Sequence, residues 1–258
     1  MVTKRRQGPK FAMLSILTTP HLLRKLFGHV LALSFLTASF NLVVIFIPLY
    51  LSQITGLIDE ERGGAYVCCS LFIYVPAVLA WGRWNDLNPP RYQSICMGVA
   101  GTMCGTPLLL LAVDSRVPSV ILASTLLYLS CLAAAYGGFA SWQVELWHTT
   151  PQCTYTGVAF AFTLSGCVFG GSVPLIGAAI TVSEITTACD AWNVSSMECF
   201  EVLSLNGVWP LRPLGAYVIS LGVLSLGSLI FVVENPEEKE ANPSQLRVPP
   251  RVLFSSRS

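Results

Sequence analysis

Six long runs without a charged residue constrain this chain of 258 residues more than any other feature. A helix needs about 20 apolar residues to cross the hydrocarbon core of a bilayer, and each run provides them. Backbone groups in lipid must find their hydrogen bonds within the protein, so unbroken runs of this length predict helices. The expected fold class is an all-α integral membrane protein with six transmembrane helices, within residues 26–58, 63–82, 92–113, 117–144, 146–183 and 213–233. The fifth run is too long for one span, and its helix is expected to begin near Thr154.

The composition agrees with this class of protein. Charged residues make up 11% of the chain, whereas soluble domains average about 25%. Hydrophobic residues make up 53%, and the mean hydropathy is +0.63. The net charge of +1 carries little information, because the charges are segregated along the chain. The expected surroundings are a lipid bilayer, and no nucleic-acid partner is expected.

The basic residues predict how the spans are oriented. Of the 15 Lys and Arg residues, 12 lie before the first span, between the second and third, or after the sixth. The other three are Arg62, Arg116 and Arg212. Cytoplasmic segments carry the excess of basic residues, so both termini are expected to be cytoplasmic in a multi-pass protein. The plasma membrane is expected rather than an organelle.

Three regions follow from this orientation. Residues 1–25 form a basic cytoplasmic lead-in, in which Pro20 is expected to start the helix of the first span. Residues 26–233 form the six-helix membrane bundle. Residues 234–258 are rich in proline and charge and are expected to be a disordered cytoplasmic tail.

The connection over residues 184–212 is the only long loop and is expected to lie outside the cytoplasm. It contains Cys189 and Cys199, a possible disulfide pair, and the sequon Asn193-Val194-Ser195, a possible glycosylation site. A disulfide and a glycan both require a non-cytoplasmic face. The six cysteines within the spans are expected to act as small apolar residues, and no cluster of Cys and His predicts a metal site.

Polar residues form stripes on two of the spans. At 100° per residue, each of two triplets falls on one side of its helix. Such stripes face either a solute-filled cavity or a neighbouring helix, to which they hydrogen-bond, and the sequence leaves both readings open. The triplets are Ser34, Thr37 and Asn41 in the first span, and Thr125, Tyr136 and Gln143 in the fourth.

Small residues form a stripe on the fifth span. Gly166 and Gly170 make a GxxxG pair, and Ala159 and Gly177 fall on the same face of a regular helix. Glycines let two backbones approach closely in lipid, which favours tight packing or a helix that slides against its neighbour. Flexing of this span is expected at the set Gly166, Gly170, Gly171, Pro174 and Gly177.

Nothing in the sequence indicates an enzyme. The three histidines lie in separate contexts, and no HExxH, GxSxG or paired intramembrane carboxylate occurs. No cofactor is expected. The span interiors contain no Asp, Glu, Lys or Arg, the residues that usually mark proton and ion paths. The turn between the second and third spans carries Gly82, Asp86 and Arg91, and an Asp/Arg pair there can latch two helix ends in one conformation.

The order of several short motifs resembles that of the major facilitator superfamily, in its metabolite–proton symporter branch. Glu145-Leu146-Trp147 is followed by Tyr155-Thr156-Gly157, and after eleven residues by Phe169-Gly170-Gly171 and Pro174-Leu175-Ile176. The turn matches the family's G-x-x-x-D-x-x-G-R-R at Gly82, Asp86 and Arg91, and departs from it at Pro89 and Pro90. The resemblance covers about residues 20–234 and only the C-terminal six helices of the family.

The resemblance implies one half-bundle of a rocker-switch transporter for a small solute. Organic acids and betaine-like metabolites are the implied solutes, and protons or another ion are the implied coupling partners. Spans one, two, four and five would line the central cavity, and the glycine face would pack against the other bundle or the second span. The second six-helix half would be an N-terminal half of this protein or another copy. The alternative function is a non-transporting half that binds or regulates another membrane protein.

One prediction tests the orientation. A cysteine introduced as Asn193→Cys in a background without other reactive cysteines should react with a membrane-impermeant maleimide added outside intact cells. Labelling of that cysteine from the cytosolic side alone would contradict the assignment of residues 184–212 to the outside.

Overall fold

The computed structural model describes residues 12–54, 58–87, 92–147, 153–192 and 211–233, and every element within these ranges is helical. Twelve elements follow one another along the chain, of which η1, η2 and η3 are π-helical turns inside longer helices. They are α1 (Ala12–Thr18), α2 (Pro20–Asn41), η1 (Leu42–Phe46), α3 (Ile47–Leu49), η2 (Tyr50–Ile54), α4 (Glu60–Leu87), α5 (Tyr92–Asp114), α6 (Pro118–Leu146), α7 (Thr154–Ser165), η3 (Gly166–Gly170), α8 (Gly171–Trp192) and α10 (Arg212–Val233).

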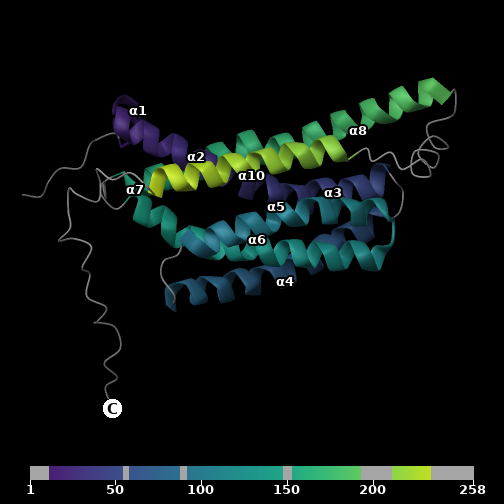
Figure 1. Ribbon diagram of the computed structural model, residues 1–258, viewed down its shortest axis with the longest axis horizontal. Coiled ribbons are helices and arrows are strands. Elements are labelled where there is room, and N and C mark those ends of the chain that lie inside the picture. Colours follow the sequence, from purple (N-terminus) through teal and green to yellow (C-terminus); the bar gives the residue numbers. More distant parts are fainter. Residues whose placement is uncertain (1–11, 55–57, 88–91, 148–152, 193–210, 234–258) are drawn as a thin grey trace, which may run out of the picture.

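Six helical units are long and apolar enough to cross a membrane, as the charge-free runs predict. The prediction of an all-helical chain with six helices of spanning length is therefore confirmed. The units are Pro20–Ser52, Glu61–Leu87, Gln93–Asp114, Pro118–Leu146, Thr154–Ile180 and Arg212–Ile230. They lie side by side and alternate in direction, so α1 and the end of α10 share one end of the bundle (Figure 1). An even number of alternating helices begins and ends at the same end of the bundle. Which end faces the cytoplasm stays a prediction.

Proline starts two of the six units. Pro20 follows Thr19, whose backbone is extended, and Pro118 follows the extended Val117. Proline suits the first helical position because its missing N–H has no partner there and its φ is already helical. The expectation that Pro20 starts the first helix is confirmed. Between α5 and α6 the chain reverses within a few residues, and Arg116 takes the left-handed conformation with φ 56°.

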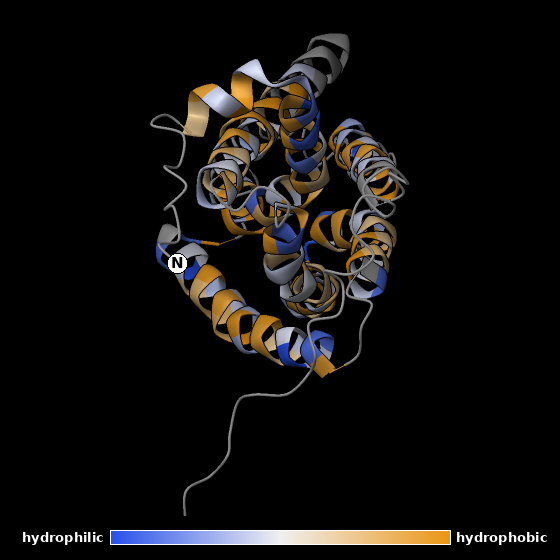
Figure 2. Cartoon of the chain, turned by 90° about the vertical axis from the view of Figure 1, so that its left-hand side faces the viewer, coloured by the Kyte–Doolittle hydropathy of each residue, from blue (hydrophilic) through white to orange (hydrophobic). Residues whose placement is uncertain are grey.

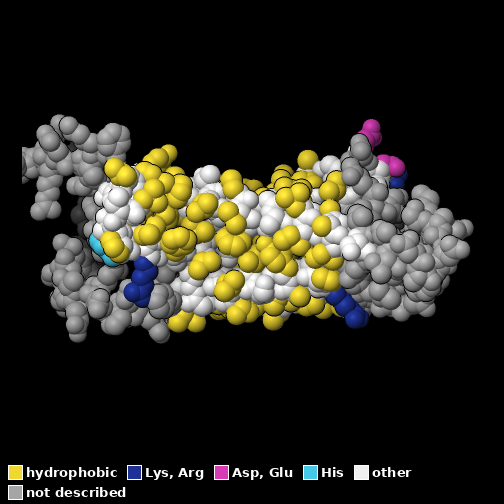
Figure 3. Space-filling view, turned by 90° about the horizontal axis from the view of Figure 1, so that it is seen from above, with side chains coloured by type: hydrophobic (Ala, Val, Ile, Leu, Met, Phe, Trp, Pro, Cys, Tyr) yellow, Lys and Arg dark blue, Asp and Glu magenta, His cyan; other side chains and the backbone are white. Residues whose placement is uncertain are grey.

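Charged side chains lie toward the ends of the bundle. The surface in Figure 3 shows hydrophobic and uncharged groups along the middle of the molecule, with Lys, Arg, Asp, Glu and His near the two ends. Figure 2 shows the same helices from one end, with hydrophobic residues on most of their turns. Apolar side chains on the outside of a helix bundle suit a hydrocarbon environment rather than water.

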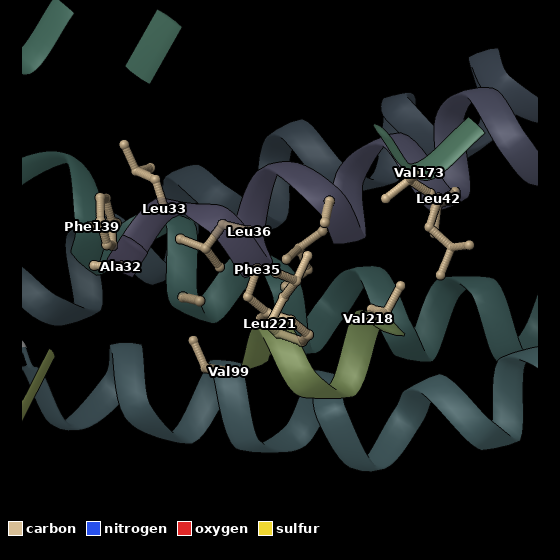
Figure 4. Close-up of a cluster of buried hydrophobic side chains, with 14 of the residues drawn as sticks. Ala32, Leu33, Phe35, Leu36, Leu42, Val99, Phe139, Val173, Val218 and Leu221 are labelled. Atoms are coloured by element: carbon tan, nitrogen blue, oxygen red, sulfur yellow. The ribbon is translucent and has the colours of Figure 1, made fainter. Parts of the chain in front are cut away.

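The first span is the centre of the bundle. In its most apolar stretch 72% of the residues are buried, compared with 17% for the span in α4 and 22% for the span that starts at Thr154. Around α2, side chains from several other helices close one core (Figure 4). Phe35 and Leu36 of α2 lie among residues such as Val99, Val218 and Leu221, from α5 and α10.

The helix pairs form a repeated pattern. The first span packs on the sixth and the fifth, while the fourth packs on the third and the second. The third and sixth spans contact each other, as do the first and fourth. If span one is exchanged with four, two with five and three with six, the same set of contacting pairs results. The matched spans run in opposite directions, because consecutive spans alternate.

Two predicted loops are partly helical. α8 continues to Trp192, so residues 184–192, predicted to begin the long loop, are helix. Gly82 and Asp86, placed in the turn after the second span, lie in α4, which ends at Leu87. The reason is that a charged residue marks the end of an apolar run but does not stop a helix, whereas the proline pair at 89–90 does.

Two glycines allow α4 and α6 to cross closely. A Cβ added to Gly137 would lie 2.7 Å from the Gly82 amide nitrogen and 2.8 Å from the Trp81 Cβ. Backbone atoms cannot move aside as a flexible side chain can. Gly82, a residue of the expected latch, therefore also serves as a contact point between two helices.

Gly137→Ala should destabilise the bundle by about 1–3 kcal/mol, because the new methyl group forces α4 and α6 apart. The measurement is the unfolding midpoint in mixed detergent and SDS micelles. Gly227→Ala is the matched control, since a Cβ at Gly227 meets nothing within 4 Å. Equal midpoints for the two variants would show that the close crossing is absent.

Candidate functional site

The polar stripe of the first span faces the fifth span. The Thr37 hydroxyl lies 3.1 Å from the Ser165 hydroxyl and also bonds the carbonyl oxygens of Leu33 and Ser34 on its own helix. The Asn41 amide donates to the Thr37 carbonyl oxygen over 2.8 Å. Ser34 is fully buried, and its hydroxyl donates to the Leu31 carbonyl of its own helix. Thr37 therefore joins two helices, while Asn41 remains partly exposed.

A π-helical turn decides which residues of the fifth span face this stripe. The buried positions of α7 are Gly157, Ala161 and Ser165, four residues apart, and the next is Gly170, five residues on. A spacing of five is the hydrogen-bonding step of a π-helix, which η3 supplies over Gly166–Gly170. The turn inserts one residue into the helix. Gly170 therefore takes the place on the packed face that Phe169 would occupy in a regular helix.

This shift corrects the predicted glycine face. Ala159 is exposed and a Cβ at Gly166 would meet nothing within 4 Å, so neither packs on the neighbouring helix. A Cβ at Gly170 would lie 2.6 Å from the Asn41 amide nitrogen, and one at Gly177 would meet the Phe46 ring. These two glycines thus pack against the first span, not the second. Gly171 is exposed, and Pro174 lies half-buried within α8.

The stripe of the fourth span divides between two neighbours. Thr125 is fully buried, and its hydroxyl lies 2.5 Å from the Tyr66 hydroxyl of α4. Tyr136 lies partly exposed near the middle of the bundle. Its ring meets Tyr74 edge-on at 6.2 Å and Phe40 at 6.5 Å, and Phe40 and Tyr74 lie 5.7 Å apart between centroids. Aromatic rings at these separations attract one another.

These contacts define a central polar–aromatic site, formed by Phe40, Asn41, Tyr74 and Tyr136. Phe40 and Asn41 are adjacent on α2, and Phe40 meets α4 and α6 while Asn41 meets the fifth span. Tyr74 is the middle residue of the span Glu61–Leu87. Two neighbouring residues of the first span therefore contact the second, fourth and fifth spans. Phe40 and Tyr74 were not predicted, because aromatic residues on an apolar span look like ordinary core.

Gln143 belongs to a separate cluster around His29, nearer the end that carries the N-terminus. His29 is fully buried, and its Nδ1 accepts a hydrogen bond of 3.1 Å from the Trp147 indole. Phe139 and Trp142 also contact the imidazole ring. Gln143 approaches this ring, but Nε2 makes no hydrogen bond. His29 is the single titratable side chain in its charge-free run apart from tyrosine, which was the available signal.

The structure describes only some of the residues in the remaining predicted sites. Asp86 is exposed in the last turn of α4, while Arg91 lies outside the described residues, so the latch stays a prediction. Cys189 lies in α8, and Cys199 and Asn193 fall outside the described part of the chain. Within the described residues, no group of three or more His, Cys, Asp or Glu is placed to hold a metal ion.

No protein-family model matches the sequence, and no curated protein matches it. The fold and composition therefore define the class of this protein at a coarse level. It is an all-helical chain with six helices long and apolar enough to cross a membrane, which is compatible with a multi-pass membrane protein.

The hydrogen bond between His29 and Trp147 can be tested by a double-mutant cycle. His29→Leu and Trp147→Phe should couple by about 0.5–1.5 kcal/mol, because each removes one partner of a buried bond. The measurement is SDS-induced unfolding in mixed micelles. The cycle of His29→Leu with Trp142→Phe is the control, since those rings meet edge-on. Coupling of the same size in both cycles would mean that packing alone holds the cluster.

Proposed function

We propose that this chain is one six-helix half of a solute transporter with a rocker-switch mechanism, as its resemblance to the major facilitator superfamily implies. The observation that carries the proposal is the central polar–aromatic site. Its residues come from the first, second and fourth spans, and Gly170 of the fifth span packs against Asn41. These four are the spans that the resemblance assigns to the cavity. Asn41 and Tyr136 are partly exposed there and offer an amide and a phenol to a solute.

The repeated pattern of helix pairs also supports this proposal. Many transporters contain two sets of helices of opposite direction, and each six-helix half of a major facilitator contains two such sets of three. The contacting pairs of this bundle stay the same when spans one, two and three are exchanged with spans four, five and six. The π-helical turns η1 and η3 lie beside the site, and such turns often occur at functional positions.

The chemistry of the site favours a betaine-like zwitterion over an organic acid. The span interiors contain no Lys or Arg to pair with a carboxylate, so the two negative charges of a dicarboxylate are costlier to bury there than the single carboxylate of a betaine. The faces of aromatic rings attract a quaternary ammonium group, and Phe40, Tyr74 and Tyr136 supply three rings. The other six-helix half would supply the groups for the carboxylate and for a coupling ion.

The alternative is a half that binds or regulates another membrane protein without transporting. The absence of an acidic residue from the span interiors favours it, because proton-coupled transport usually depends on such a residue. Under this alternative, the chain takes up no solute, either by itself or with a second six-helix half.

The test is uptake of labelled betaine and of labelled dicarboxylates into proteoliposomes. We expect betaine uptake by the active assembly to fall about tenfold or more in Tyr136→Phe and in Asn41→Ala, because each loses a hydrogen-bonding group for the solute. Unfolding midpoints are measured in parallel. Ser220→Ala is the control, since this exposed serine bonds only the Tyr217 carbonyl of its own helix.

The assembly is varied in the same experiment. The chain is reconstituted alone and together with any six-span segment encoded upstream of Met1. Robust uptake by the chain alone would refute the regulatory alternative and indicate two copies as the transporting unit. No uptake of any solute in either arrangement would overturn the proposed function.

A further inference from the structure

A groove opens between α4 and α5 near the end of the bundle at which α1 lies. α4 and α5 hardly contact each other, and both pack on α6, which forms the floor of the groove. The volume of the groove is about 490 Å³. Its walls include Trp81 and Asn85 of α4 and Ser94 and Met97 of α5, and Ser130 lies on the floor.

Asn85 is the unusual residue of this groove. Its exposed fraction is 3%, and its amide nitrogen has no hydrogen-bond partner among the described residues. A buried amide without a partner destabilises the fold, which favours an acceptor from outside the protein. The site is also tightly built: a Cβ at Gly138 would lie 2.9 Å from the Ser94 hydroxyl and 3.1 Å from the Asn85 amide nitrogen. The Asn85 donor is therefore held in place at the junction of three helices.

The depth of Asn85 indicates which acceptor would reach it. Asn85 lies between Arg83 and Asp86 in the last turns of α4, where the charge-free run has ended. Trp84 lines the same groove beside Trp81, and tryptophan gathers at the boundary between hydrocarbon and headgroups. At this level the lipid itself presents acceptors, namely the ester carbonyls that join its acyl chains to glycerol.

We propose that the groove binds one glycerophospholipid, with an ester carbonyl accepting a hydrogen bond from the Asn85 amide and an acyl chain lying over Ser130. The groove runs from the level of Gly138 to that of Ser130, roughly 12 Å at the rise of an α-helix. That length suits the upper part of an acyl chain. The proposal rests on the membrane setting of the proposed function and is independent of transport.

The size of the groove argues against a helix of a second copy as the occupant. A helix with its side chains is about 10 Å wide, so a 12 Å length would need about 900 Å³. The groove offers about 490 Å³. Its place between α4 and α5 also separates it from the central polar–aromatic site, which includes no residue of α5. The groove is therefore separate from the proposed transport site.

The experiment counts lipids retained by the full chain after mild detergent release, by native mass spectrometry. The chain is first reconstituted in nanodiscs of diester phosphatidylcholine or of diether phosphatidylcholine with the same chain length. The diether lipid lacks the carbonyl oxygens. Wild type should retain one diester lipid with an occupancy about 2- to 10-fold above that of the diether lipid, the value of one hydrogen bond.

Two variants separate the parts of the site. Asn85→Leu keeps the branched shape of the side chain and removes the donor, so the preference for the diester lipid should disappear. Ser130→Phe fills the floor and should abolish retention of both lipids. Gly227→Phe is the matched control, because Gly227 lies exposed on α10 with nothing within 4 Å of an added Cβ, and it should behave as wild type.

The outcomes distinguish this proposal from the proposed function. Equal retention of the two lipids by wild type, or no retained lipid, would overturn the lipid site while uptake measurements stand unchanged. A dimer that Ser130→Phe dissociates would identify a second copy as the occupant and also overturn it. A chain that carbonate extracts from the bilayer would refute the membrane setting and both proposals together.

Discussion

The rest of the structure depends on how closely other helices can approach the first span. α2 is enclosed by helices on several sides, and small groups at the crossing points make this possible. Gly170 and Gly177 bring the fifth span against it. The hydroxyls of Ser225 and Ser228 of α10 donate to carbonyl oxygens of α2, each over 2.6 Å. In lipid there is little hydrophobic drive between helices, so packing and such bonds hold them together.

Polar side chains in this bundle serve two different purposes. Thr125 and Ser165 pair with side chains on a neighbouring helix, so their hydroxyls act as links. Asn41 and Tyr136 are only partly buried, and His29 and Asn85 each keep a nitrogen without a partner. The second kind has the greater functional interest, because a buried donor or acceptor that the fold leaves unpaired is available to a solute, a proton or a lipid.

The sequence predicted the lengths of the helices correctly but not which of their faces pack against other helices. It located all six spans and the start of the first helix at Pro20, and it selected Thr37, Asn41, Thr125 and Tyr136 as residues of interest. It could not divide these into links and site residues, since a stripe looks the same in both cases. The predicted face of Ala159 and Gly166 was wrong because a regular helix was assumed across η3. Asn85 was missed because it lies between Arg83 and Asp86, where the sequence predicted a turn.

The sequence by itself determined the number and the positions of the helices long enough to span a bilayer, because this property depends on local hydrophobicity and length. Only the tertiary structure decided which span is central, which glycines lie between helices and which polar groups stay unpaired. The physical reason is that these properties depend on the register of each helix and on the shape of its neighbours. One inserted residue in η3 turns the following helix, and no count along the chain reveals what that turn will meet.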